Sequence, residues 1–136
     1  MAGGSPVLIC IINRFRTVMQ QVLLVAVGGA TGSVLRFLLQ RYYNNSFFPY
    51  GTLAVNIAGC LLIGILWGLL LKNNLHTTGR LLLMTGFCGG FTTFSAFTQE
   101  SIQLLTEQRW SAFFLYTLLS VAAGLLATFT GYKLIP

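Results

Sequence analysis

Long apolar stretches alternate with short polar connections along the whole chain. Each stretch reaches the roughly 20 residues that an α-helix needs to cross a bilayer. The apolar residues run continuously, without the in-out alternation that is typical of strands in a membrane β-barrel. The pattern predicts an all-α integral membrane protein with four transmembrane helices, at Val18–Leu39, Tyr50–Leu71, Leu81–Leu105 and Trp110–Leu134.

Composition supports the same class. Of the 136 residues, 55% are hydrophobic and only 7% are charged, whereas soluble domains average about 25% charged residues. The connections centre on "RYYNNSFFP", "KNNLHTTGR" and "TEQR", and each is too short to form a soluble domain. Any activity must therefore lie within the helices or between them.

The reactive and basic residues point to no enzyme and no nucleic-acid partner. Cys10, Cys60 and Cys88 share no metal-ligand spacing, and His76 stands alone in a connection. The formal charge of +6 comes without a basic cluster interleaved with aromatics, which a nucleic-acid surface needs. Basic residues in membrane proteins chiefly mark topology.

The chain begins with a segment that does not fit the span pattern. Its apolar run, Pro6–Ile12, is too short to cross a bilayer, and Arg14 and Arg16 follow this run instead of preceding it as in a signal peptide. We therefore expect residues 1–17 to be an N-terminal extension and residues 18–136 to form the four-helix membrane unit.

The basic residues are nearly balanced between the two sides of the membrane. Four spans place both termini on one side, with five basic residues there and three opposite; without the two arginines of the extension the balance is three to three. Charge bias normally sets orientation, so a balanced chain can insert both ways. Two oppositely inserted copies can pair as an antiparallel, dual-topology homodimer.

Small residues recur at helical spacing. Three pairs are four residues apart: Gly28 and Gly32, Gly64 and Gly68, and Gly86 and Gly90. In lipid, such pairs let two helix backbones approach closely. For the first two pairs we expect helix packing.

Three polar side chains lie in or near the spans. Asn56 is the single amide of the second span, and it serves either as an interhelical hydrogen bond or as a donor facing a solute path. Arg36 either extends to the interface or draws anions to a pore mouth. Glu100 either pairs with a cation or reaches water.

The stretch "GFCGGFTTFSAF", residues 86–97, interrupts the third span with glycines and hydroxyls. The residues that weaken the helix or compete for its backbone hydrogen bonds are Gly86, Gly89, Gly90, Thr92, Thr93 and Ser95. They predict a helix broken near its middle, with a simple packing kink as the alternative. Open backbone at membrane depth must line a cavity or be buried in protein, and its freed carbonyls can coordinate a cation.

Two phenylalanines follow this interruption. Phe94 and Phe97 are three residues apart and share one helical face. Such pairs usually belong to a core, but their ring edges carry the positive part of the aromatic quadrupole. Beside hydroxyl donors and without a nearby carboxylate, these edges suit a path for a small anion.

Three segments together resemble a known family. "GGATGSVLRF" (28–37), "PYGTLAVNIAGCLLIG" (49–64) and "GFCGGFTTFSAF" (86–97) are similar in order and spacing to the motifs of the Fluc (CrcB) family of fluoride channels. The resemblance implies an antiparallel homodimer with two fluoride pores and a central sodium ion. It also implies passive fluoride export across a bacterial inner membrane, which relieves fluoride toxicity.

The resemblance assigns roles to individual residues. Phe94 and Phe97 match the pore phenylalanines whose edges meet fluoride, and Asn56 matches the pore amide donor. The backbone carbonyls of Gly89 and Thr92, one pair from each subunit, match the ligands of the sodium ion.

Further positions follow the pore or its entrance. Thr52 and Arg36 match family positions near the pore and its entrance. Neutral hydrogen-bond donors are supplied by Thr93, Ser95, Tyr116 and Ser120. Ala96 and Gly124 depart from positions where the family often carries a hydroxyl, which shortens the expected polar track.

Two other functions fit a short membrane chain less well. A small four-helix proton-coupled multidrug exporter needs a carboxylate in its first span, and Val18–Leu39 contains none. A purely structural membrane subunit explains the glycine pairs but not the polar cluster after the interruption.

Overall fold

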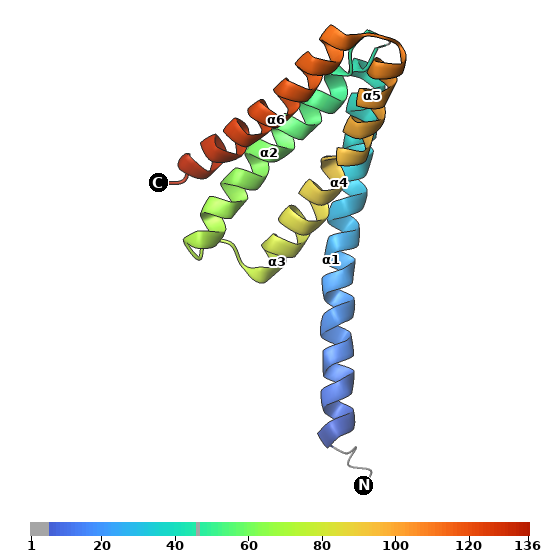
Figure 1. Cartoon of the computed structure of the whole chain (residues 1–136). Coiled ribbons are helices and arrows are strands. Elements are labelled where there is room, and N and C mark those ends of the chain that lie inside the picture. The colour runs from blue at the N-terminus through green and yellow to red at the C-terminus, as the bar shows by residue number, and fades with distance from the viewer. Residues whose placement is uncertain (1–5, 46) are drawn as a thin grey trace.

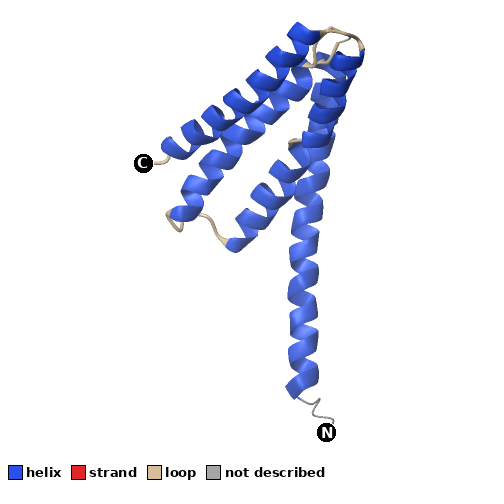
Figure 2. Cartoon of the chain, viewed as in Figure 1, coloured by secondary structure: helices blue, strands red, loops and turns tan. Residues whose placement is uncertain are grey.

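The computed structural model describes residues 6–45 and 47–136, and its elements are helical apart from one isolated bridge between Asn44 and Pro49 (Figures 1 and 2). The elements are α1 (Pro6–Tyr43), α2 (Tyr50–Leu71), α3 (Thr77–Gly79), η1 (Arg80–Cys88), α4 (Gly89–Phe91), α5 (Phe94–Thr106) and α6 (Trp110–Lys133). Elements α3, η1 and α4 follow one another without a gap, and η1 has the wider π-helical turn. Within the described residues, four helical stretches are long and apolar enough to cross a membrane, which confirms the predicted all-α, four-span class.

The first helix begins earlier than predicted. We expected a span from Val18 after a separate extension, but α1 starts at Pro6 and continues for 38 residues. Proline is compatible with the first helical turn because its missing N–H has no intrahelical partner there. No further proline or glycine occurs before Gly28, so no helix-breaking residue interrupts this part of α1. Arg14 and Arg16, which we assigned to the extension, lie within the helix. In Figure 1 the N-terminal part of α1 projects beyond the other helices.

Glycines bring α1 close to the third span. A Cβ atom at Gly28 would lie 2.1 Å from the carbonyl oxygen of Leu82, and one at Gly32 would lie 2.3 Å from that of Phe87. A Cβ atom at Gly90 would lie 2.4 Å from the carbonyl oxygen of Gly29. Side chains at these positions would force the backbones apart, so the predicted packing role of the first pair is confirmed.

Close backbone contacts at glycines also join α2 to α6, which lie side by side in Figure 1. A Cβ atom at Gly64 would lie 2.1 Å from the carbonyl oxygen of Thr128, and one at Gly131 would lie 2.3 Å from that of Leu61. Gly64 therefore packs as predicted, and Gly131 of α6 is its counterpart.

A small core closes the end of the bundle where α1 turns into α2. Phe48, Leu104 and Tyr116 form its buried cluster, and the rings of Phe48 and Tyr116 meet edge to face at 5.5 Å. The Asn45 side chain stabilises the turn because its Oδ1 accepts hydrogen bonds from the backbone N–H groups of Phe47 and Phe48. This core holds the N-terminal part of α6 against α5, next to the polar groups described below.

Candidate functional site

The helical segment that contains α4 ends at Phe91, and α5 begins at Phe94. Between them, Thr92 (φ −82°, ψ 154°) and Thr93 (φ −149°, ψ 116°) have extended backbone. The Thr93 hydroxyl then caps α5 by accepting the N–H of Ala96 at 3.1 Å, as N-terminal threonines commonly do. The preceding glycines lie within the helical segment, so the extended residues are the threonines.

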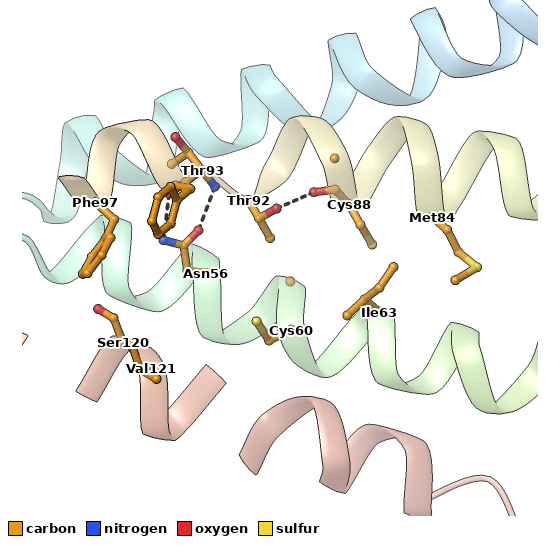
Figure 3. A pocket seen from close by; sticks show the side chains of 13 residues that line it. Asn56, Cys60, Ile63, Met84, Cys88, Thr92, Thr93, Phe97, Ser120 and Val121 are labelled. Carbon is orange, nitrogen blue, oxygen red and sulfur yellow. Dashed lines mark hydrogen bonds between the residues drawn. The ribbon is translucent and has the colours of Figure 1, made fainter. Parts of the chain in front are cut away.

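Asn56 of α2 holds this extended segment in place. Its Nδ2 donates to the Thr93 carbonyl at 3.1 Å, and its Oδ1 accepts the Thr93 N–H at 2.8 Å (Figure 3). The amide thus replaces the backbone partners that Thr93 would have in a helix. Asn56 makes the interhelical hydrogen bonds of our first alternative, and one Nδ2 hydrogen is engaged in this pair.

The pairing of Asn56 with Thr93 changes the hydrogen bonding of the backbone carbonyls before the extended segment. In a continuous helix the N–H of Thr93 would donate to the Gly89 carbonyl, but here it donates to Asn56. Thr92 donates both its N–H and its hydroxyl to Cys88, at 3.0 and 2.9 Å. Gly89 is exposed, and a Cβ atom there would meet nothing within 4 Å. A bound cation would therefore have both a freed carbonyl and open space at Gly89.

The next carbonyl along the chain, that of Gly90, accepts hydrogen bonds from two side chains of α1. Arg36 donates from Nε to the Gly90 carbonyl at 3.0 Å, and the Ser33 hydroxyl donates to the same oxygen at 3.3 Å. Arg36 is partly buried and also donates from Nη1 to Gln40 at 3.4 Å. Its guanidinium contacts the backbone of α4, an arrangement that neither sequence alternative described.

A second polar cluster lies around Thr52 on α2, whose side chain is fully buried. Thr52 donates to Glu100 of α5 at 2.6 Å, and its hydroxyl oxygen accepts from Gln40 at 2.9 Å and from Asn44 at 3.1 Å. The Tyr116 hydroxyl of α6 donates to the other Glu100 oxygen at 2.7 Å. Three helices and the end of α1 thus converge on one carboxylate.

The partners of Glu100 differ from both expectations for this residue. It is surrounded by neutral donors from Thr52, Asn44 and Tyr116, where the sequence suggested a cation or water. Hydrogen bonds from several neutral donors stabilise a partly buried carboxylate. Gln40 and Asn44, which complete this cluster, were missed because they lie near the end of the first span, where polar residues normally face water.

The two phenylalanines differ in their surroundings. Phe97 packs against the small core, with its ring centroid 5.3 Å from that of Tyr116. The ring centroid of Phe94 lies 5.6 Å from that of Phe97, and 76% of the Phe94 surface is exposed. One ring is therefore held by the fold, and the other faces outward from a single copy of the chain.

A cavity of about 420 Å³ lies beside the extended segment, between α2, the third span and α6 (Figure 3). It brings together seven of the residues that the sequence singled out: Asn56, Gly89, Thr92, Thr93, Phe94, Phe97 and Ser120. The remaining lining residues are Gly59, Cys60, Ile63, Met84, Cys88 and Val121. The lining contains no ionisable carboxylate, amine or guanidinium group.

Ser120 gives the cavity a polar group that lacks a partner. Its Oγ is buried and has no hydrogen-bond partner among the described residues, and a buried polar atom of this kind needs one. Gly124, one turn further along α6, packs against Cys60, since a Cβ atom there would lie 3.4 Å from the Cys60 Sγ. Ser120 is therefore the α6 hydroxyl that meets the cavity.

The other predicted residues lie around the cavity instead of lining it. Thr52 and Tyr116 belong to the Glu100 cluster, and Arg36 contacts the Gly90 carbonyl of α4. Ser95 is exposed, within 3.1 Å of the Thr93 hydroxyl. Across residues 6–45 and 47–136, no three His, Cys, Asp or Glu side chains gather as metal ligands, so a cation at this site would use backbone or hydroxyl oxygens.

Similarity to known proteins covers most of the chain. The sequence profile of the family described as CrcB-like protein, Camphor Resistance (CrcB), matches residues 23–132. A protein of Flavobacterium psychrophilum named fluoride-specific ion channel FluC is 49% identical over 117 residues, which cover 83% of this chain and 94% of that protein. A protein of the same name from Phocaeicola vulgatus is 46% identical over 116 residues, 83% of this chain and 96% of the relative.

A third relative comes from Rhodococcus jostii. Fluoride-specific ion channel FluC 2 of Rhodococcus jostii is 46% identical over 114 residues, again 83% of this chain and 96% of the relative. The matched region includes the second and third spans, most of the first and fourth, and every residue of the cavity. With the helical architecture and this degree of identity, the chain is a multi-pass membrane protein of the CrcB family, a family of ion channels and not of enzymes.

Proposed function

We propose that this protein is a fluoride-selective channel that lets fluoride leave the cell passively and so relieves its toxicity. The observation that carries the proposal is the buried, unpartnered hydroxyl of Ser120 in a cavity that is also lined by Asn56 and Phe97. A hard anion gives up water only where firm donors replace it. Neutral donors allow release as well as binding, which conduction requires.

The relatives' printed names support fluoride as the ion. The residues of the proposed path are the cavity residues Asn56, Thr93, Phe94, Phe97 and Ser120, with Ser95 at the exposed side. Thr52 and Tyr116 would support this path from beside it, since their hydroxyls donate to Glu100. The location that we propose is a bacterial inner membrane, where the channel would release fluoride that enters the cell.

We further propose that two copies pair as an antiparallel, dual-topology homodimer with two pores. Phe94 is 76% exposed and Gly89 faces open space, so one copy leaves a wall of the cavity incomplete. The near balance of basic residues between the two sides suits insertion in both orientations. A second copy would cover Phe94 and supply the missing wall.

A sodium ion at the centre of this dimer fits the residues present. The carbonyls of Gly89 and Thr92 would hold it, one pair from each copy, because carbonyl oxygens at an interrupted helix suit Na⁺. The end of α4 is also the negative end of the helical segment from Thr77 to Phe91. The bound ion would supply a fixed positive charge that stabilises the interrupted backbone.

Liposomes test the function directly. Purified protein is reconstituted at low density into liposomes loaded with potassium fluoride, and release is followed with a fluoride electrode after valinomycin relieves the charge. We expect rapid fluoride release and almost no chloride release from a parallel sample. Equal release of both halides, or of neither, would refute a fluoride channel; drug-dependent proton uptake would instead indicate the multidrug exporter.

Substitutions in the cavity locate the path. Phe94→Ile removes the exposed ring edge, and Asn56→Asp replaces the Nδ2 donor to Thr93 with an oxygen. We expect each to slow fluoride release at least tenfold while the protein elutes at the size of the wild type. Phe114→Ile is the matched control, because Phe114 is also exposed but lies on α6 outside the cavity; similar rates in all three variants would place the path elsewhere.

A further inference from the structure

The carbonyl of Cys88 at the end of η1 and those of Gly89 and Gly90 in α4 differ in their hydrogen-bond partners. Cys88 accepts from Thr92, and Gly90 accepts from Arg36 and Ser33. The N–H that would pair with Gly89 is diverted to Asn56. Two groups from neighbouring helices, the Asn56 amide and the Arg36 guanidinium, thus decide which carbonyl of the turn is left for another ligand.

Arg36 suits this position electrostatically. A cation at a helix C-terminus is stabilised by the partial negative charge of the last carbonyls. The contact uses Nε, at 3.0 Å from the Gly90 oxygen, and the planar guanidinium keeps its other donors in fixed directions. Arg36 does not line the cavity, and its Nε contacts the backbone of α4.

A chain of hydrogen bonds continues from Arg36 to the second polar cluster. Its Nη1 donates to Gln40 at 3.4 Å, Gln40 donates to Thr52 at 2.9 Å, and Thr52 donates to Glu100 at 2.6 Å. The cationic end of this chain lies at the interrupted helix and the anionic end lies beside Tyr116. Linked opposite charges of this kind reduce the cost of placing either one within a membrane.

We propose that Arg36 is a positioning residue for the cation site at the end of α4. By occupying the Gly90 carbonyl, it fixes the last turn so that the adjacent Gly89 carbonyl is presented to Na⁺, and through Gln40 it ties this turn to Thr52. The proposal rests on the cation site of the proposed function. It differs from attraction of anions to a pore mouth, because it predicts an effect on cation binding in the absence of fluoride.

Thermal unfolding of the purified dimer in detergent tests this role without any fluoride transport. The unfolding midpoint is measured against NaCl concentration, with KCl keeping the ionic strength constant and no fluoride present. A ligand that binds only the native state raises the midpoint according to its affinity. We expect Na⁺, and not K⁺, to raise the midpoint of the wild type.

In Arg36→Met we expect the half-saturating Na⁺ concentration to rise about tenfold or more, since the loss of groups that orient metal ligands commonly costs 10–100-fold in affinity. Arg41→Met is the matched control, because Arg41 is an exposed arginine in the last turn of the same helix. If Arg36→Met does not fold, Ser33→Ala removes the second donor to Gly90 and should raise the concentration by a smaller factor.

An unchanged Na⁺ dependence in both Arg36→Met and Ser33→Ala would overturn the proposal. It would also be overturned if the wild type showed no specific stabilisation by Na⁺, or if Arg41→Met shifted the dependence as much as Arg36→Met. These outcomes are independent of fluoride release from liposomes, so failure of this inference and failure of the channel function can be distinguished.

Discussion

Replacing Thr52 by valine removes one buried hydroxyl and leaves the shape of the side chain almost unchanged. The hydroxyl makes three hydrogen bonds, one donated to Glu100 at 2.6 Å and two accepted from Gln40 and Asn44 at 2.9 and 3.1 Å. Asn44 also donates to Glu100 at 2.9 Å, so it retains a partner in the variant. The Gln40 Nε2 group loses its acceptor, and Glu100 Oε1 keeps only the bond from Asn44.

The magnitude follows from the number of bonds. Side-chain hydrogen bonds within membrane proteins contribute on average ~0.6 kcal/mol each and at most ~1.7 kcal/mol. Three bonds at the average give about 2 kcal/mol, and three at the upper value give about 5 kcal/mol. The bond to a carboxylate belongs near the upper value, because hydrogen bonds to charged groups are stronger. We expect Thr52→Val to lower the free energy of unfolding by about 2–5 kcal/mol, at least a 30-fold change in the equilibrium.

The assay is equilibrium unfolding in mixed detergent micelles, followed by the fluorescence of the two tryptophans. Thr31→Val is the matched control: this exposed threonine donates only to carbonyls of its own helix, at Val27 and Gly28. The control should stay within ~0.5 kcal/mol of the wild type. If the two valine variants differed by less than 0.5 kcal/mol on this scale, the Glu100 cluster would not stabilise the fold as described.

Two further predictions concern packing and pH. Gly28→Ala places a methyl group 2.1 Å from the Leu82 carbonyl oxygen, so the helices must separate and stability should fall by about 1–3 kcal/mol; Gly29→Ala meets its nearest atom at 3.8 Å and should be neutral or stabilising in the same unfolding assay. The Gln103 side chain donates a hydrogen bond to Glu107 at 2.9 Å and lowers the Glu107 pKa, so this pair stabilises the fold above about pH 4 and the contribution disappears as the carboxylate protonates. Glu107→Gln should therefore have a slightly lower unfolding midpoint than the wild type at pH 7, and the difference should shrink as the pH falls below the ordinary glutamate pKa of 4.5; a difference that grows on acidification would contradict this assignment.

The boundaries of the helices were predictable to the extent that apolar runs ended at helix-breaking residues. The second span begins at Tyr50 and ends at Leu71 as expected, because proline precedes it and a polar turn follows. The first helix starts earlier than the predicted span, because polarity alone does not stop a helix: the segment between Pro6 and Gly28 contains no helix-breaking residue. Hydrophobic patterning reports where lipid contact ends, whereas helix termination depends on backbone geometry.

The interruption in the third span shows the same difference at finer scale. Glycines suggested where the helix was weak, yet Gly89 and Gly90 are helical and the extended residues are Thr92 and Thr93. Glycine permits an irregular backbone without requiring it. The extended conformation at Thr93 is stabilised by Asn56 of another helix, and this partner is distant in sequence.

The sequence by itself determined the class of protein, the number of spans, the glycine contacts between helices and the polar residues that belong to a candidate path, because each of these follows from local composition and helical spacing. Only the tertiary structure decided the partners of those residues. Thr52, Glu100 and Tyr116 lie on three helices and meet through packing, and Arg36 reaches a carbonyl 54 positions away. A buried polar group must find a partner wherever the fold provides one, and helical spacing carries no information about which distant group that is.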